Sequence, residues 1–240
     1  MSSKRVLLKL SGEALLGNPA TAGRQESGID FSVLGSLSDQ LLEVQKAGYQ
    51  VAVVVGAGNI WRFRDNNGSG IDRVSSDYMG MLATIMNSMA LMSAIQNQGG
   101  QARVCSALSF PVVVDLYTKR LAHQYLNEGK IVICAAGTGN PFFTTDSAAA
   151  LRALELECDL LLKGTNTDGV YDSDPKKNGK AKKYDTISFD EVLEKNLKVM
   201  DGAAIALCRD GNMPIQVFQF GEAGAILSAI QGKIGTKVYS

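Results

Sequence analysis

The feature that most constrains the fold of this 240-residue chain is a regular alternation of short apolar runs with longer amphipathic stretches. The apolar runs are rich in β-branched residues and have the length of buried strands: Arg5–Leu10, Gln50–Val55, Arg103–Ser106, Ile131–Ala135, Leu160–Lys163 and Ile215–Phe218. The stretches between them have helical character: Asp30–Ala47, Asp77–Gln96, Thr118–Glu128, Asp146–Leu156, Phe189–Lys195 and Asp201–Asp210. This alternation predicts an α/β fold, a three-layer α/β/α sandwich around a central, mainly parallel open sheet.

The length of the chain fits a single domain with a substantial core. No linker divides residues 1–240 cleanly, so we expect one domain with a functional division near residue 150. Two polar, glycine-bearing segments, Gly17–Gly28 and Phe63–Ser76, are predicted to be mobile surface loops.

Charge and composition exclude several classes of protein. The 24 Lys and Arg balance 24 Asp and Glu, so there is no overall field to hold a nucleic acid or an anionic membrane. Any phosphate must be bound locally. Lys9 interrupts the first apolar run too early for a signal peptide, and no stretch approaches the roughly 18 apolar residues of a membrane span. We therefore expect a cytoplasmic protein.

The cysteines are predicted to be reduced thiols of the core. They show no CxxC spacing, which argues against a zinc site, and the expected compartment argues against disulfides. The four positions are Cys105, Cys134, Cys158 and Cys208.

Three glycine-bearing turns each follow a predicted strand: Ser11-Gly12, Gly56-Ala57-Gly58 and Gly137-Thr138-Gly139. Glycine lets backbone N–H groups approach a phosphate closely, and a following helix N-terminus adds partial positive charge. Any one turn alone is as compatible with a simple strand-to-helix connection. The P-loop pattern GxxxxGK[ST] and the dinucleotide-binding pattern GxGxxG are both absent.

Two lysines stand at predicted strand ends beside such turns. Lys9 precedes Ser11-Gly12, and Lys163 precedes Gly164-Thr165. A lysine at a buried strand end is costly unless its ammonium meets an anion or reaches the edge of the sheet. Together the two lysines suggest clamps on a transferring phosphoryl group, whose loose transition state needs positioning and cations more than a base.

Acidic residues near these turns have two readings. Asp146 and Asp201 each open a predicted helix, where an acid is favoured as a cap. Asp146 also suits a place between the two lysines, and Asp201 a contact to a metal through water. The turn 168–175 is polar and lacks the EF-hand spacing, so it suits a nucleoside, with Tyr171 against the base and Asp174 near the ribose.

These segments together resemble the amino-acid-kinase superfamily, and within it the bacterial uridylate kinases. The similarity lies in the order and spacing of six segments that extend over nearly the whole chain. They are KLSGEAL (9–15), VVGAGNIWR (54–62), SDYMGMLATIMNSMAL (76–91), AGTGNPFFTTDSAA (136–149), DGVYDSDP (168–175) and KVMDGAA (198–204).

The resemblance implies transfer of the γ-phosphoryl group of ATP to UMP, giving UDP and ADP, in pyrimidine nucleotide synthesis. Catalytic positions would be Lys9, Lys163 and Asp146. ATP, whose side of the domain would be roughly residues 151–240, would contact Lys9, Leu10, Ser11, Gly12, Gly58, Arg62, Thr165, Tyr171 and Asp174. UMP, on the 1–150 side, would contact Ala57, Arg62, Asp77, Thr138, Gly139, Asn140, Pro141, Phe142, Phe143, Thr144 and Thr145.

The resemblance also implies Mg²⁺ bridging the ATP phosphates, a homohexamer, activation by GTP and inhibition by UTP. The chain departs from the usual family pattern in the 17–28 loop and at Leu91-Met92-Ser93, which bears on GTP regulation. Two alternatives stay open from the residues: a superfamily kinase acting on an amino acid or carbamate-like acid, and a nucleotide-binding regulator that lost the chemistry. Arg62, Asp77 and the phenylalanine-containing loop favour a nucleotide acceptor over a small amino acid.

Overall fold

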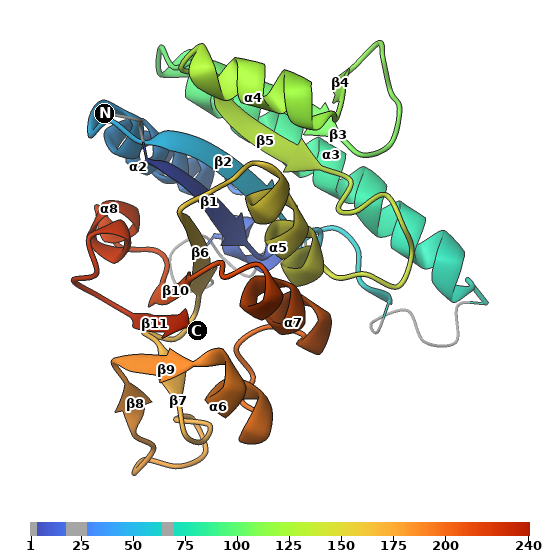
Figure 1. Ribbon diagram of the computed structural model, residues 1–240. Coiled ribbons are helices and arrows are strands. Elements are labelled where there is room, and N and C mark those ends of the chain that lie inside the picture. The colour runs from blue at the N-terminus through green and yellow to red at the C-terminus, as the bar shows by residue number, and fades with distance from the viewer. Residues whose placement is uncertain (1–3, 18–27, 64–69) are drawn as a thin grey trace.

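The computed structural model describes residues 4–17, 28–63 and 70–240. Within these residues nine strands form one twisted sheet (Figure 1). Their order across the sheet is β4 (Asp115–Leu116), β3 (Ala102–Ser106), β5 (Ile131–Ala135), β2 (Gln50–Val55), β1 (Arg5–Leu10), β6 (Leu160–Thr165), β10 (Ile215–Gln219), β11 (Thr236–Tyr239) and β9 (Thr186–Ser188). Neighbouring strands are parallel except β10 and β11, which are antiparallel.

Helices cover both faces of the sheet, each group over its own hydrophobic cluster. One face carries α2 (Phe31–Lys46), α3 (Arg73–Asn97) and α8 (Ala225–Ile230). The other carries α4 (Lys119–Asn127), α5 (Thr145–Glu155), α6 (Phe189–Glu194) and α7 (Gly202–Asp210). A 3-10 turn, η1 (Gly12–Leu15), follows β1, and β7 (Val170–Tyr171) pairs with β8 (Lys183–Tyr184) in a separate ribbon. The expected three-layer α/β/α sandwich with a mainly parallel sheet is confirmed.

The alternation of side chains along β1 decides where its lysine lies. Val6, Leu8 and Leu10 pack into the cluster under α2, α3 and α8, whereas Leu7 packs into the cluster under α4 to α7. Successive strand residues point to opposite faces. Lys9 therefore lies on the same face as Leu7, which is the face that α5 covers.

Most predicted elements are confirmed, and one boundary is wrong in a way that matters. Helix α3 begins at Arg73 and not at Asp77, because Asp72 caps it by accepting from the Ser75 amide at 3.0 Å. The loop expected over Phe63–Ser76 is therefore wrong for its last four residues, 73–76, which are helical. Its residues 64–69, and residues 18–27 of the other expected loop, lie outside the described part of the chain.

The elements that the sequence analysis missed are short, and apart from η1 and β4 they lie in the C-terminal third. Strands β9 and β11 extend the sheet beyond β10, and α8 packs on β10 and β6. The three and four residues of β9 and β11 are too few to distinguish a strand from a loop by pattern. Tertiary pairing, with β11 against β10, determines them.

Helix α3 also corrects the expectation that no stretch approaches the apolar length of a membrane span. By length and composition alone it is apolar enough to cross a membrane. In the structure 44% of its most apolar 18-residue segment is buried, and the helix packs on β3 and β5 as core helices do. Helix α3 therefore has the length and composition of a membrane span although it belongs to the hydrophobic core.

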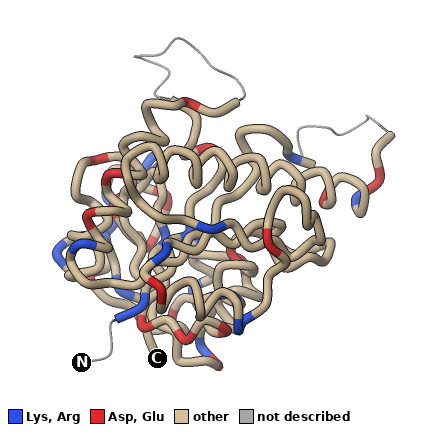
Figure 2. Tube along the Cα trace, turned by 90° about the horizontal axis from the view of Figure 1, so that it is seen from above, with Lys and Arg blue, Asp and Glu red and all other residues tan. Residues whose placement is uncertain are grey.

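The remaining expectations from composition concern the cysteines and the charged residues. All four cysteines are buried and free, which confirms the reduced core thiols. Burial raises the pKa of the Cys105 thiol to about 12, so it stays protonated at neutral pH. Figure 2 shows Lys and Arg interspersed with Asp and Glu along the trace.

The different burial of two phenylalanines predicts that their substitution changes stability by different amounts. Phe218, on β10, is fully buried in the core, whereas Phe31, at the start of α2, is 81% exposed. Phe218→Ala should lower the free energy of unfolding by about 3 to 5 kcal/mol, because a large cavity forms. Phe31→Ala, the matched control, should change it by roughly 0.5 kcal/mol or less. Urea denaturation measures both, and equal effects would contradict this account of the core.

Candidate active site

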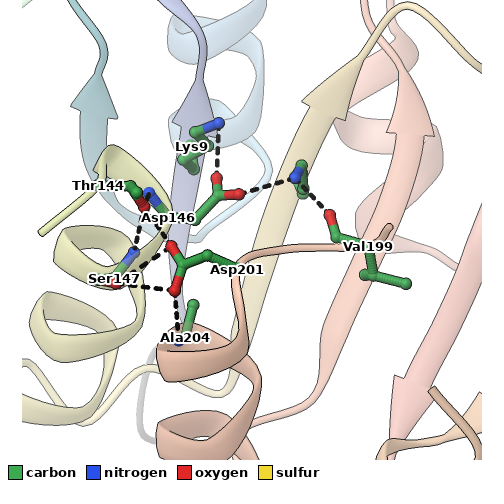
Figure 3. Close-up of polar contacts among 8 residues, drawn as sticks. Lys9, Thr144, Asp146, Ser147, Val199, Asp201 and Ala204 are labelled. Carbon is green, nitrogen blue, oxygen red and sulfur yellow. Dashed lines mark hydrogen bonds and ion pairs between the residues drawn. The ribbon is translucent and has the colours of Figure 1, made fainter. Parts of the chain in front are cut away.

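Two lysines and one aspartate meet at the carboxyl ends of the central strands. Lys9 of β1 and Lys163 of β6 are partners in the parallel register. Asp146, in the first turn of α5, lies between them, and Figure 3 shows its carboxylate beside Lys9. Its Oδ1 is 2.6 Å from the Lys9 Nζ, and its Oδ2 is 3.0 Å from the Lys163 Nζ. The expected placement of Asp146 between the two ammonium groups is confirmed.

The charges of this cluster do not balance. Burial opposes ionisation of Asp146, but Lys9 and then Lys163 outweigh burial and lower the pKa of its carboxyl below 3.8. Burial lowers the pKa of Lys163, and Asp146 offsets this only in part because Lys9 repels the second ammonium. Two ammonium groups thus share the Asp146 carboxylate. Lys163 also donates to the Val199 carbonyl, and the nearby Asp201 carboxylate favours its charged form. A further anion placed beside the two ammonium groups would be attracted to them.

Helix starts surround the cluster. Thr144 caps α5 by accepting from the amides of Asp146 and Ser147, and Asp201 caps α7 by accepting from the Ala204 amide at 3.0 Å. Asp201 also accepts hydroxyl hydrogen bonds from Thr144 and Ser147, so one carboxylate joins the N-termini of both helices (Figure 3). The reading of Asp201 as a helix cap is confirmed. Both helix N-termini bring partial positive charge to the site.

A cavity of about 620 Å³ opens on the Lys9 side of the cluster. Many of the residues expected around UMP line it: Ala57, Arg62, Asp77, Thr138, Asn140, Phe143, Thr144 and Thr145, together with Lys9, Asp146 and Asp201. Among the described residues of the same loop, Gly139, Pro141 and Phe142 do not line it. Gly58, which was expected around ATP, also lines this cavity. The sequence analysis missed Glu13, Trp61, Phe63, Arg73, Ser76, Gly80, Met81, Thr84 and Gly137, which also line it.

A second cavity of about 420 Å³ opens on the Lys163 side. It contains three of the residues expected around ATP, Thr165, Tyr171 and Asp174, and a wall from the 195–199 segment. Asp168 fixes the Tyr171 ring by accepting from its hydroxyl at 2.6 Å. As far as the described residues show, Leu10, Ser11 and Gly12 line neither cavity; the Leu10 side chain is fully buried in the core.

Arg62 and Asp77 have protein partners on the wall of the larger cavity. Arg62 donates from Nε to the Gly58 carbonyl at 2.8 Å and forms an ion pair with Glu13. Asp77 accepts from the Phe142 amide at 2.7 Å and pairs with Arg73. Glu13 was missed because it lies in a different segment from Arg62. Arg73 was missed because the helix was expected to begin only at Asp77, so the pairing of these two residues along one helix was not considered.

Gly12 is required by the contact between two of the glycine turns. A Cβ at this position would lie 2.4 Å from the Gly58 amide nitrogen and 2.5 Å from the Asn59 Oδ1. No larger side chain fits without moving the turn after β2. The turns after β1 and β2 therefore pack directly on each other beside Lys9.

The comparisons with known proteins agree with this arrangement. A profile of the family described as "Amino acid kinase family" matches residues 4–219. A uridylate kinase of Zymomonas mobilis is 51% identical over 228 residues, which are 95% of this chain and 92% of that protein. The crystal structure of UMP kinase from Ureaplasma parvum superposes with a TM-score of 0.92 at 38% identity and covers 100% of both chains. This chain belongs to the amino acid kinase family, in its uridylate kinase branch.

A second relative in the same branch, a uridylate kinase of Xanthomonas campestris, is 49% identical over 239 residues, with 99% of this chain and 97% of that protein covered. The resemblance to the amino-acid-kinase superfamily and its uridylate kinases is thus confirmed. For a kinase of this family, it matters which side chains could bind a metal ion directly. Among the described residues, no group of three or more His, Cys, Asp or Glu side chains is placed to hold one.

The ion pairs predict how the stability of this uridylate kinase relative depends on pH. Because the folded-state pKa of Asp146 lies below 3.8, its ionised form stabilises the fold above pH 3.8, and this is lost as the pH falls through the folded-state pKa. Asp146→Asn should therefore destabilise the protein at pH 7 and less so at pH 3. Denaturant titrations at both pH values measure this, with the exposed Asp39→Asn as control. A loss of stability in Asp146→Asn that is larger at pH 3 than at pH 7 would contradict the stabilising role of the ionised Asp146.

Proposed function

We propose that this chain is a UMP kinase, a phosphotransferase that converts UMP and ATP to UDP and ADP in pyrimidine nucleotide synthesis. The observation that carries the proposal is the pair of ammonium groups that share Asp146 at the boundary of two cavities. One cavity suits the acceptor and the other the donor nucleotide. The uridylate kinase relatives support UMP as the acceptor.

In the acceptor cavity Arg62 would bind the UMP phosphate. Its forked donors match a phosphate better than a single carboxylate, so the phosphate would replace Glu13 as its partner. The Asp77 carboxylate would accept from the ribose hydroxyls. The loop from Thr138 to Thr145 would surround the rest of the nucleotide.

In the donor cavity Tyr171 would lie against the adenine and Asp174 near the ribose, with Thr165 between them and the phosphates. Lys163 then reaches the γ-phosphoryl group from the donor side, and Lys9 from the acceptor side. This assigns the acceptor to residues 1–150 and most of the donor site to 151–240, within one domain.

The chemistry that the residues must supply is electrostatic. The attacking atom is a phosphate oxygen of UMP, which is already ionised at neutral pH and needs no general base. The loose transition state spreads charge over the oxygens of the moving phosphoryl group. Lys9 and Lys163 neutralise that charge, and Asp146 keeps both ammonium groups in place before the reaction, so little reorganisation is needed.

The described carboxylates fit a Mg²⁺ ion held chiefly by ATP. Both oxygens of Asp146 contact ammonium groups, and Asp201 accepts from two hydroxyls and one amide. Direct metal bonds from either would break these contacts, whereas a bound water can contact Asp201 without doing so. Mg²⁺ keeps several waters and favours phosphate oxygens. When bound, it would neutralise charge on the ATP phosphates.

The family resemblance supports further proposals on assembly, regulation and place in the cell. These are a homohexamer, inhibition by UTP, activation by GTP and a cytoplasmic location. The Leu91-Met92-Ser93 segment bears on GTP regulation: Leu91 is fully buried in α3, whereas Ser93 is exposed.

An amino-acid acceptor is the main competing function. A steady-state assay of ADP release with UMP, CMP, glutamate and aspartate distinguishes the two. The proposal predicts turnover with UMP. Turnover with an amino acid and none with UMP would overturn it, and tight binding of ATP and UMP without UDP formation would indicate a regulator.

The lysine pair predicts a large effect of one side chain on turnover. Lys163→Ala should lower kcat by roughly 10²- to 10³-fold, as expected when one preorganised donor to the transition state is removed. Lys119→Ala, which removes an exposed lysine paired with Glu157, is the matched control and should keep full turnover. A fall in kcat of less than about threefold for Lys163→Ala would show that this ammonium does not contact the reacting group.

Arg62 should affect the acceptor selectively. In Arg62→Ala we expect a loss mainly in kcat/KM for UMP, with ATP affinity nearly unchanged. The reason is that Arg62 lines the acceptor cavity and not the donor cavity. Kinetics with each nucleotide varied in turn measure the two effects. A collapse of ATP affinity would contradict the division into two sites.

A further inference from the structure

The turn that leaves β5 has a backbone that is costly to maintain. Ala136 and Gly137 are consecutive residues in the left-handed region, with φ of 60° and 58°. Ala136 carries a Cβ and therefore loses energy there, unlike glycine. Gly137, Thr138 and Asn140 line the acceptor cavity. Something outside the turn must hold it in this conformation.

The first hold comes from α3. Thr84 is buried, and its Oγ1 accepts from the Ala136 amide at 2.8 Å. The hydroxyl proton is donated to the Met81 carbonyl at 2.7 Å, which leaves the oxygen lone pairs for the amide. The Ala136 N–H is thus satisfied by a side chain from a helix far away in the sequence.

The second hold comes from α5, on the opposite face of the sheet (Figure 1). Arg152 is 5% exposed, and its Nη2 donates to the Gly137 carbonyl at 3.2 Å. Its guanidinium is fixed by Glu155 at 2.5 Å and lies over the Tyr117 ring, 3.9 Å from the ring centre. Tyr117 donates to Glu155 in turn at 2.8 Å. This network makes Arg152 a rigid donor.

We infer that Thr84 and Arg152 are positioning residues for the acceptor nucleotide. They hold the two peptide groups on either side of the strained Ala136–Gly137 pair, one from each helical layer. The turn can then present Thr138 and Asn140 to the cavity without waiting for the nucleotide to order it. The inference rests on the proposed function for its kinetic effect, but the hold itself exists in the protein without nucleotide.

Thr84→Val tests the hold because it keeps the shape of the side chain and removes the acceptor. We expect the Ala136 amide to exchange with solvent faster, and kcat/KM for UMP to fall roughly 10- to 100-fold with the KM for ATP unchanged, since a buried amide loses its partner. Thr84→Ser keeps the hydroxyl and should restore both values. Hydrogen exchange read by NMR and steady-state kinetics provide the two measurements.

Ser38→Ala is the matched control. Ser38 is also buried in a helix, α2, and donates from its hydroxyl to the Leu34 carbonyl at 2.8 Å, but it lines neither cavity among the described residues. It should lower the melting temperature without changing the kinetics for UMP. If Thr84→Val behaves in the same way, with Ala136 exchange unchanged, the inference is wrong.

Arg152→Lys provides the second test if Thr84→Val does not fold. Lysine keeps the charge but lacks the fork that joins Glu155 to the Gly137 carbonyl. Faster exchange in the 136–140 segment and a raised KM for UMP support the inference, and unchanged values for both overturn it. If the wild-type protein does not phosphorylate UMP, the proposed function fails, while hydrogen exchange still decides whether Thr84 and Arg152 hold the turn.

Discussion

The Lys9–Asp146–Lys163 contact is the interaction on which the rest of the site depends. A buried ammonium is costly unless an anion satisfies it, and here a single carboxylate serves two. The arrangement is possible because β1 and β6 are neighbours in parallel register, with the two lysines opposite each other. Lys9, Asp146 and Lys163 together carry one positive charge, which the nearby Asp201 carboxylate offsets in part, and we propose that the two ammonium groups bind the transferred phosphoryl group.

The fold supplies the rest of the site from both helical layers. On the α5 and α7 face, Asp201 joins two helix N-termini beside the lysines. On the opposite face, α3 contributes Thr84 to the turn after β5 and Asn87 to the turn after β2, where its Nδ2 donates to the Gly56 carbonyl at 2.8 Å. The loops that leave the strand ends are therefore held by side chains from helices, which preorganises the rim of the larger cavity.

Local pattern was sufficient to predict the features of the fold that lie within one segment. The strands Arg5–Leu10, Gln50–Val55 and Ile131–Ala135 are short, largely apolar runs, and all three agree with the structure at both ends. The lysine pair was predictable as well, because a lysine within an apolar run needs a reason. Asp146 followed from its place at a helix start.

What could not be predicted depends on contacts between distant segments. Nothing near Thr84 in the sequence indicates that its hydroxyl accepts from the Ala136 amide 52 residues away. Buried polar residues in an apolar helix, such as Thr84 and Asn87, are the one available signal, and they were read only as part of a family motif. Strand β11 likewise depends on pairing with β10 for its existence.

A crystal structure with UMP and a non-hydrolysable ATP analogue tests the central claim most directly. The account predicts that the two nucleotides occupy the two cavities and that the terminal phosphate of the analogue lies within about 3 Å of both the Lys9 and Lys163 ammonium groups, the usual distance of a charge-assisted hydrogen bond. A terminal phosphate in contact with neither ammonium, while both remain on Asp146, would contradict it.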